Sequence, residues 1–144
     1  MAYATLADLE TNFGTVEINQ LTDRDGNGIN DSGVADKELD NATSTIDTYL
    51  ANKYTTPITN ISDYLNKVTC DIARFYLHKD RATEQVTKNY SNAIAWLKDI
   101  AIGKAVLTDN TGVPIVASGG AGGTVEYYAS PEMFADDNLK QFIC

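Results

Sequence analysis

The chain is short of the residues and runs that most often reveal a protein's class. Its 144 residues include only two cysteines, three prolines and one histidine. No stretch approaches the roughly 18–20 apolar residues of a membrane helix. The start, MAYATLADLE, has neither the basic residues nor the apolar segment of a secretory signal. We therefore expect no membrane span, and a protein that is made in the cytoplasm and is not secreted.

Cysteines and basic residues are too few for several common kinds of site. Cys70 and Cys144 lie far apart, so they form neither a disulfide framework nor a metal knuckle. We expect both to be free thiols, with Cys70 in the core. With 11 basic against 20 acidic residues, the formal net charge is −9, and this charge repels nucleic-acid phosphates. Sequence-independent DNA binding is therefore not expected as the main function, whereas this charge suits a protein that stands near DNA without binding it.

What the chain does have is a helical pattern over residues 1–103. Hydrophobic residues make up 43% and charged residues 22% of the whole chain, as in one ordinary soluble domain. Two short helices come first. The stretch LADLETNF is capped by Thr5 and ended by Gly14, and TVEINQL follows it. We expect both to pack on the longer helices through their apolar faces.

Three longer helices are predicted after these two. The first shows apolar residues three and four apart from Val34 onward, with Asp31 or Ser32 as the expected N-cap and Lys53 at the end of the stripe. The linker TTPITN follows, because proline removes a donor and disfavours helix before it. Ser62 is then expected to cap the second long helix.

The last predicted helix is the longest; it starts at Asp80 or Thr83 and is ended by Gly103. The three long helices together predict an all-α small helical bundle. The apolar side chains expected to be buried are Ala35, Leu39, Ala42, Ile46 and Tyr49 on the first, Leu65, Val68, Ile72, Phe75 and Tyr76 on the second, and Val86, Tyr90, Ala93, Leu97, Ile100 and Ala101 on the third.

The character of the sequence changes over residues 104–144. β-branched residues flank DNTG, which predicts a hairpin, and ASGGAGGT is typical of a flexible hinge. Apolar residues beyond such a hinge are poorly placed for the core of the bundle. We therefore predict an extended tail that folds on a partner at an ordering cost. Its interface residues are Tyr127, Tyr128, Met133, Phe134 and Phe142. The alternative is a strand or turn that packs back on the chain's own bundle.

Motifs of catalysis are missing from the sequence: it has no phosphate loop and no HExxH, CxxC or GxSxG pattern. The stretch GGAGG lacks the following lysine or helix of a nucleotide loop. His78 has the chemistry of a general base, but it shares no motif with a nucleophile, and a polar residue at a helix end is the favoured interpretation. We predict no catalytic residues and a protein that is not an enzyme.

The stretch LTDRDGNGIND, residues 21–31, has the oxygen spacing of a calcium loop. The ligands would be Asp23, Asp25, Asn27, the carbonyl of Ile29, and Asp31. Val34 stands where such a loop has its bidentate glutamate. Asp and Asn also bond their own backbone, so a loop of this composition joins two helices with or without an ion. We predict a helix junction whose calcium is optional, and no other cofactor.

Several segments in the same order resemble one known family over nearly the whole chain. They are MAYATLADL, INQLTDRDGNGIND, IDTYLANKYTTP, CDIARFYLHKDRATEQVTKNYSNAIAWLKDIAIGKAVL and SPEMF. The chain resembles the Mu-like phage family of small head–tail connector, or adaptor, proteins, and CDIARFYLHKDRATEQV is the most specific segment. The family offers no catalytic residues to carry over. The stretch GVPIVASGGAGGTVEYY is variable in that family, so its contacts do not transfer.

This resemblance implies a structural protein of the virion, located in the neck between head and tail. It implies a homo-oligomeric ring, a dodecamer in the commonest case, that holds the portal to other neck or tail-completion proteins. The ring would line the channel through which DNA passes, without specific binding. The alternative function is a monomeric cation-binding module whose Asp-rich loop switches the helix pair.

Overall fold

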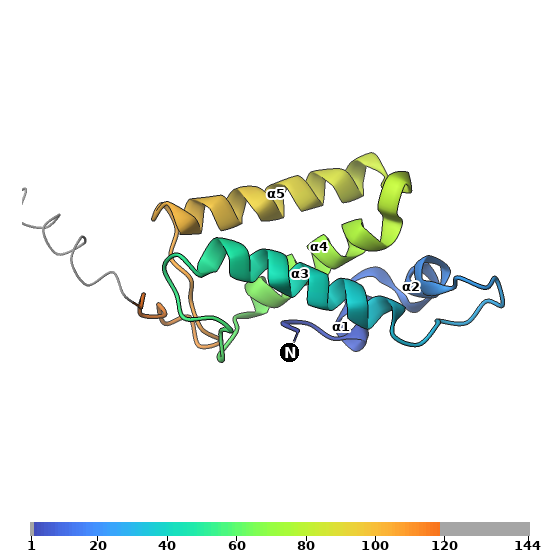
Figure 1. Ribbon diagram of the computed structural model, residues 1–144, viewed down its shortest axis with the longest axis horizontal. Helices are drawn as coiled ribbons and strands as arrows, with labels where there is room; N and C mark the ends of the chain where they lie inside the picture. Colours follow the sequence, from blue (N-terminus) through green and yellow to red (C-terminus); the bar gives the residue numbers. More distant parts are fainter. Residues whose placement is uncertain (1, 119–144) are drawn as a thin grey trace, which may run out of the picture.

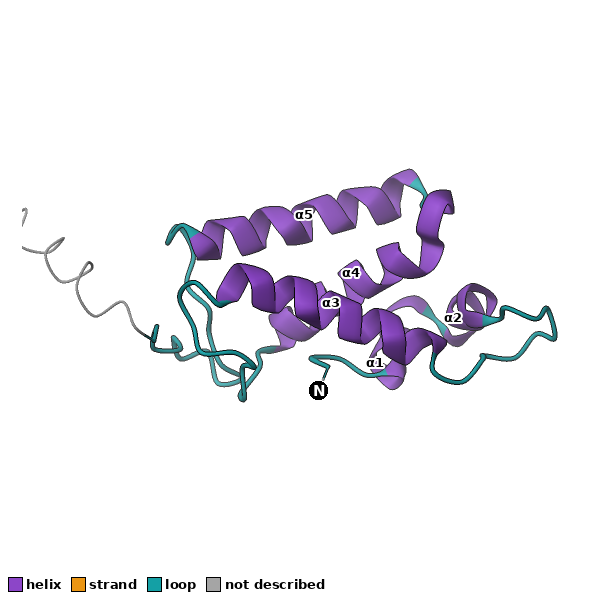
Figure 2. Ribbon diagram, in the orientation of Figure 1, coloured by secondary structure: helices purple, strands orange, loops and turns teal. Residues whose placement is uncertain are grey.

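The computed structural model describes residues 2–118, which form a bundle of α-helices (Figures 1 and 2). The predicted all-α class is confirmed, since the described residues hold five α-helices, one 3₁₀ turn and no strand beyond a single isolated bridge. No helix among them is long and apolar enough to cross a membrane. The elements are α1 (Leu6–Phe13), α2 (Thr15–Thr22), α3 (Val34–Leu50), α4 (Asp63–His78), η1 (Lys79–Arg81) and α5 (Glu84–Ala101).

Helix α4 is the centre of the bundle, because it packs against all four other α-helices. α3 and α5 also contact each other, and the short pair α1–α2 lies on the side of α4 away from α5 (Figure 1). The buried side chains of all five helices form one cluster. Burial of one such side chain stabilises the fold by about 1.5–3 kcal/mol. Those that are fully buried include Leu9, Ile18, Leu39, Ile46, Leu65, Ile72, Leu97 and Ile100.

Three predicted helix starts are confirmed by side-chain caps. The hydroxyl of Thr5 accepts from the Asp8 amide of α1, that of Ser62 from the third residue of α4, and that of Thr83 from the third residue of α5. The predicted N-cap of α3, Asp31 or Ser32, is wrong. Gly33 is the N-cap, with a left-handed φ of 82° and no side-chain hydrogen bond. The Asp31 carboxylate is engaged elsewhere, because it accepts from the amide of Arg24.

The predicted buried stripes are mostly confirmed, with differences at their ends. On α4, Phe75 and Tyr76 are only partly buried, because they line an open groove between α3 and the end of α4. Phe75 stacks on Tyr90 with ring centroids 4.0 Å apart, and the Tyr76 hydroxyl lies 2.8 Å from that of Thr45. Lys53 lies beyond the end of α3, in the turn that follows it.

Residues 104–118 return along the α3–α4 connection at one end of the bundle (Figure 1). The predicted hairpin around DNTG forms with one bridge, between Thr108 and Pro114. The Ile115 amide donates to the Leu107 carbonyl over 2.8 Å. Leu107 is fully buried, and its amide donates to the hydroxyl of Tyr54 over 3.2 Å. The Ser118 amide then donates to the carbonyl of Lys53 over 2.8 Å. The hairpin is therefore anchored to the bundle.

Candidate functional site

The Asp-rich loop between α2 and α3 brings three of the predicted metal ligands together. One carboxylate oxygen each from Asp23, Asp25 and Asp31 lies within 4.8 Å of the others. Asp23 organises the loop, since its two oxygens accept from the amides of Gly26 and Gly28 over 2.7 Å and of Asn27 over 3.1 Å. The turn needs glycine at two places, because Gly26 and Gly28 have φ angles of 81° and 84°.

The other predicted ligands, Asn27 and the carbonyl of Ile29, belong to the same turn, in which the Asn27 side chain hydrogen-bonds within the loop. The Asn27 side-chain oxygen accepts from the amide of Ile29 over 2.8 Å. The Asp25 carboxylate accepts from the amide of Asn27 over 3.1 Å and from its side-chain nitrogen over 2.9 Å. No carboxylate of α3 joins the group that the described residues form. The loop is thus held by hydrogen bonds of its own, as the helix-junction interpretation requires.

Replacing Asp23 by alanine should lower the melting temperature at neutral pH. The amides of Gly28, Gly26 and Asn27 hold the pKa of Asp23 below its ordinary value of 3.8, so its stabilising effect is present above pH 3.8 and disappears as pH falls through the lower folded-state pKa. The measurement is thermal unfolding of both proteins from pH 7 down to pH 2. The two melting temperatures should converge in acid, and a gap that persists there contradicts the assignment.

A charged cluster joins the short helices to α4. Arg74 donates to the Glu17 carboxylate over 2.6 Å, and its guanidinium lies 4.3 Å from the centre of the Phe13 ring. His78, the last residue of α4, has Nε2 3.6 Å from the same Glu17 oxygen. A pocket of about 490 Å³ opens beside His78, and among the described residues no serine, threonine or cysteine lines it. What the described contacts of the cluster do is join the short helices to α4.

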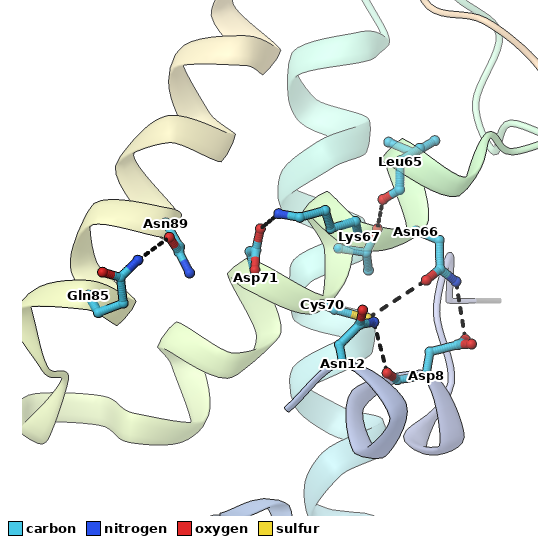
Figure 3. A network of polar contacts seen from close by, with 10 residues as sticks. Asp8, Asn12, Leu65, Asn66, Lys67, Cys70, Asp71, Gln85 and Asn89 are labelled. Carbon is cyan, nitrogen blue, oxygen red and sulfur yellow. Dashed lines mark hydrogen bonds and ion pairs between the residues drawn. The ribbon is translucent and has the colours of Figure 1, made fainter. Parts of the chain in front are cut away.

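Cys70 lies inside a polar network that joins α1 to α4 (Figure 3). Its thiol lies 3.9 Å from the side-chain oxygen of Asn66, whose nitrogen donates to Asp8 over 3.1 Å. Cys70 is fully buried, as the sequence predicts. Burial raises the pKa of the Cys70 thiol to about 12, and the thiolate is the reactive form of cysteine.

In a Cys144→Ser variant, Cys70 should therefore resist alkylation by iodoacetamide at pH 8 for as long as the protein is folded. The measurement is the mass increase of the intact protein, with the same variant in guanidinium as the control. Complete alkylation is expected only in the unfolded control. Rapid labelling of the native protein would show that α1 opens away from α4.

Exposed apolar side chains concentrate at one end of the bundle, a feature that the sequence reasoning missed. The described residues include seven large hydrophobic side chains that are exposed, and four of the seven fall within residues 102–116. These four are Ile102, Val106, Val113 and Val116, which are 71%, 57%, 56% and 88% exposed. The hairpin explains the exposure of two of them. Side chains alternate across it, so Leu107 and Ile115 face the bundle while Val106 and Val116 face outward.

Two lysines border this apolar group. The ammonium of Lys53 would lie 2.9 Å from a Cβ added at Gly103, which places the charge directly beside the residues that follow α5. Lys104 is exposed next to it. We call Ile102, Val106, Val113 and Val116, with Lys53 and Lys104, the end surface. Alternation of β-branched residues about DNTG is the signal that could have predicted that Val106 and Val116 share one face of the hairpin. The predicted interface residues, Tyr127, Tyr128, Met133, Phe134 and Phe142, lie outside the described residues.

The model of the family described as Bacteriophage Mu, Gp36 matches residues 3–124. The chain belongs to this family. Over 105 residues it is 34% identical to gene product J of Escherichia phage Mu, covering 72% of this chain and 74% of that protein. It is also 36% identical over 73 residues to the Mu-like prophage FluMu protein gp36 of Haemophilus influenzae, covering 51% and 52%. The predicted kinship with Mu-like phage proteins is confirmed.

The Gp36 match takes in every element that the structure describes. The Asp-rich loop, the Glu17–Arg74–His78 cluster and the end surface all fall inside residues 3–124. The match ends where the apolar segment after the glycine-rich hinge begins. Membership therefore applies to the helical bundle and its hairpin, and the five interface residues predicted from the sequence lie beyond it.

Proposed function

We propose that this Gp36-family chain is a structural protein of the virion, a head–tail connector that forms a ring in the neck. The ring would bind the portal on one side and other neck or tail-completion proteins on the other. The observation that carries the proposal is membership of a family whose members come from phage Mu and a Mu-like prophage.

The end surface supports an assembly role. Four exposed apolar side chains within fifteen residues are the kind of group that marks a protein–protein contact. The charge of −9 supports the proposed place beside DNA, since a negative wall lets a duplex slide without binding it. The resemblance seen in the sequence adds the ring, a dodecamer in the commonest case.

The test is mass spectrometry of particles purified with intact necks from the phage that encodes the chain. We expect the chain in these particles, in several copies per portal ring, and also in tailless heads, because a connector joins the head first. Electron microscopy of the same particles should place it directly below the portal. Particles with complete necks that lack the chain would overturn the proposal.

A second candidate function, a cation-binding module, is favoured by the three carboxylates of the Asp-rich loop. Calorimetric titration with calcium separates the two candidates. With the closing glutamate replaced by Val34 and Asp23 already bonded to three amides, we expect weak binding and no rise in melting temperature at micromolar calcium. Strong stabilisation at micromolar calcium would instead make the ion an integral part of the fold.

A further inference from the structure

The end surface lies where the described chain ends. Val116 belongs to it, and the Ser118 amide is tied to the carbonyl of Lys53 over 2.8 Å. Residues 118–123 are SGGAGG, and residues 124–144 follow with two tyrosines, two phenylalanines, a methionine, a leucine and an isoleucine. A linker of six residues reaches at most about 20 Å. Each chain thus carries an exposed apolar surface and, a short distance along the sequence, an apolar segment.

The charges of the two parts are complementary. The end surface has the ammonium of Lys53 beside Gly103 and the exposed Lys104 next to it. Residues 124–144 contain four acidic residues against the single Lys140. Opposite charges around an apolar contact fix its register and suppress wrong partners. The end surface is therefore suited to an acidic segment with aromatic anchors, which is what residues 124–144 provide.

We propose that the end surface of one copy binds residues 124–144 of a second copy. The inference deepens the proposed function, and it rests on the ring proposed there. Docking on the chain's own end surface would order the six-residue linker into a tight loop, which costs conformational entropy. Docking on a neighbour's surface does not impose this closed loop. One donor segment and one acceptor surface per chain make a head-to-tail contact, and contacts of this type form a ring where the rotation between copies closes.

The first experiment measures this contact with two purified components. The acceptor is the chain stopped after Gly123, which keeps every described residue. The probe is a synthetic peptide of residues 124–144, labelled with fluorescein at Cys144. Fluorescence anisotropy should show saturable one-to-one binding. A peptide that does not bind the acceptor overturns the proposal.

Variants of the acceptor locate the binding site. Ile102→Glu and Val116→Glu place a carboxylate in the contact and should each weaken binding about tenfold or more, since an unpaired charge in an interface is costly. The control is Val16→Glu on α2, because Val16 is 72% exposed and Ile102 71%, and it should bind as the unmodified acceptor does. All three positions are exposed, so the fold is expected to survive. Equal affinities for all four proteins place the peptide elsewhere and overturn the proposal.

A charge reversal tests the electrostatic part. Lys104→Glu should weaken binding and reduce its dependence on salt, whereas Lys88→Glu, on the exposed side of α5, should do neither. If Lys104→Glu changes neither the affinity nor its salt dependence, the two parts do not attract each other by charge, and the proposal that residues 124–144 are the occupant fails.

The full chain itself distinguishes a neighbour's segment from the chain's own. By native mass spectrometry the unmodified full chain should form oligomers, whereas the full chain with Ile102→Glu and Val116→Glu and the chain stopped after Gly123 should each be monomeric. A one-to-one mixture of these two defective chains should give a heterodimer. An unmodified full chain that stays monomeric while the peptide binds shows docking within one chain, which overturns the proposal. Absence of the chain from particles would defeat the proposed function and leave these binding results unchanged.

Discussion

Replacing Tyr3 by alanine is expected to cost about 3–5 kcal/mol of folding free energy, the usual loss for a large buried aromatic side chain. Tyr3 is 4% exposed and ties three parts of the chain together. Its hydroxyl donates to Asp47 of α3 and accepts from the Ile58 amide over 2.9 Å. Its own amide donates to the hydroxyl of Thr43 over 3.0 Å. The measurement is chemical unfolding of both proteins at neutral pH.

A milder change separates the hydroxyl from the ring. Tyr3→Phe keeps the packing but leaves the buried amide of Ile58 without its acceptor, which should cost about 1–3 kcal/mol. The control is Tyr64→Phe, because Tyr64 is 50% exposed and its ring contacts Trp96 edge-on at 4.9 Å. That variant should unfold like the wild type. If Tyr3→Phe does the same, the hydroxyl bonds contribute nothing to stability.

Alkaline pH should affect the wild type through the same hydroxyl. Burial and the bond to Asp47 raise the pKa of Tyr3 above its ordinary value of 10.0. The neutral phenol is therefore favoured by folding, and its contribution is complete below pH 10 and is lost as pH rises above it. Tyr3→Phe has no such proton, so its stability should decline less between pH 9 and pH 11.

The helices could be predicted from the sequence because their signals are local. Thr5, Ser62 and Thr83 each stand one residue before an apolar-periodic run, and each caps a helix in the structure. The start of α3 could not be predicted in this way. Asp31 is a good N-cap by its chemistry, but its carboxylate closes the preceding loop on Arg24. The Asp31 carboxylate could either cap α3 or close the loop, and in the structure it closes the loop.

The candidate sites also differ in whether local sequence or long-range contacts form them. The Asp-rich loop spans residues 21–31, so its spacing alone predicts which carboxylates come together, and Asp23, Asp25 and Asp31 do so. The end surface depends on contacts over long separations, such as Tyr54 with Leu107 and Lys53 with Ser118. Only these contacts decide which face of the hairpin is covered. A sequence pattern shows that Val106 and Val116 share a face, but not that this face is left open.

Two truncations are expected to have opposite effects, and together they define the folding unit. A chain stopped after Gly103 loses the fully buried Leu107, to whose amide the hydroxyl of Tyr54 is bonded. The loss of one such side chain costs about 2–5 kcal/mol. A chain stopped after Gly123 loses none of the contacts of the described residues, so its melting temperature should match that of the full chain.

The chain stopped after Gly123 should nevertheless fail to assemble. Residues 124–144 carry aromatic and aliphatic side chains worth about 1.5–3 kcal/mol each when fully buried, and the sequence assigns them to a partner. A phage that encodes only residues 1–123 should therefore produce no infectious particles, although the truncated protein accumulates in folded form. Infectivity is measured by plaque count and folding by circular dichroism of the purified protein. Normal plaque numbers would show that the contacts between copies, and those with the portal, are all made by the bundle and its hairpin.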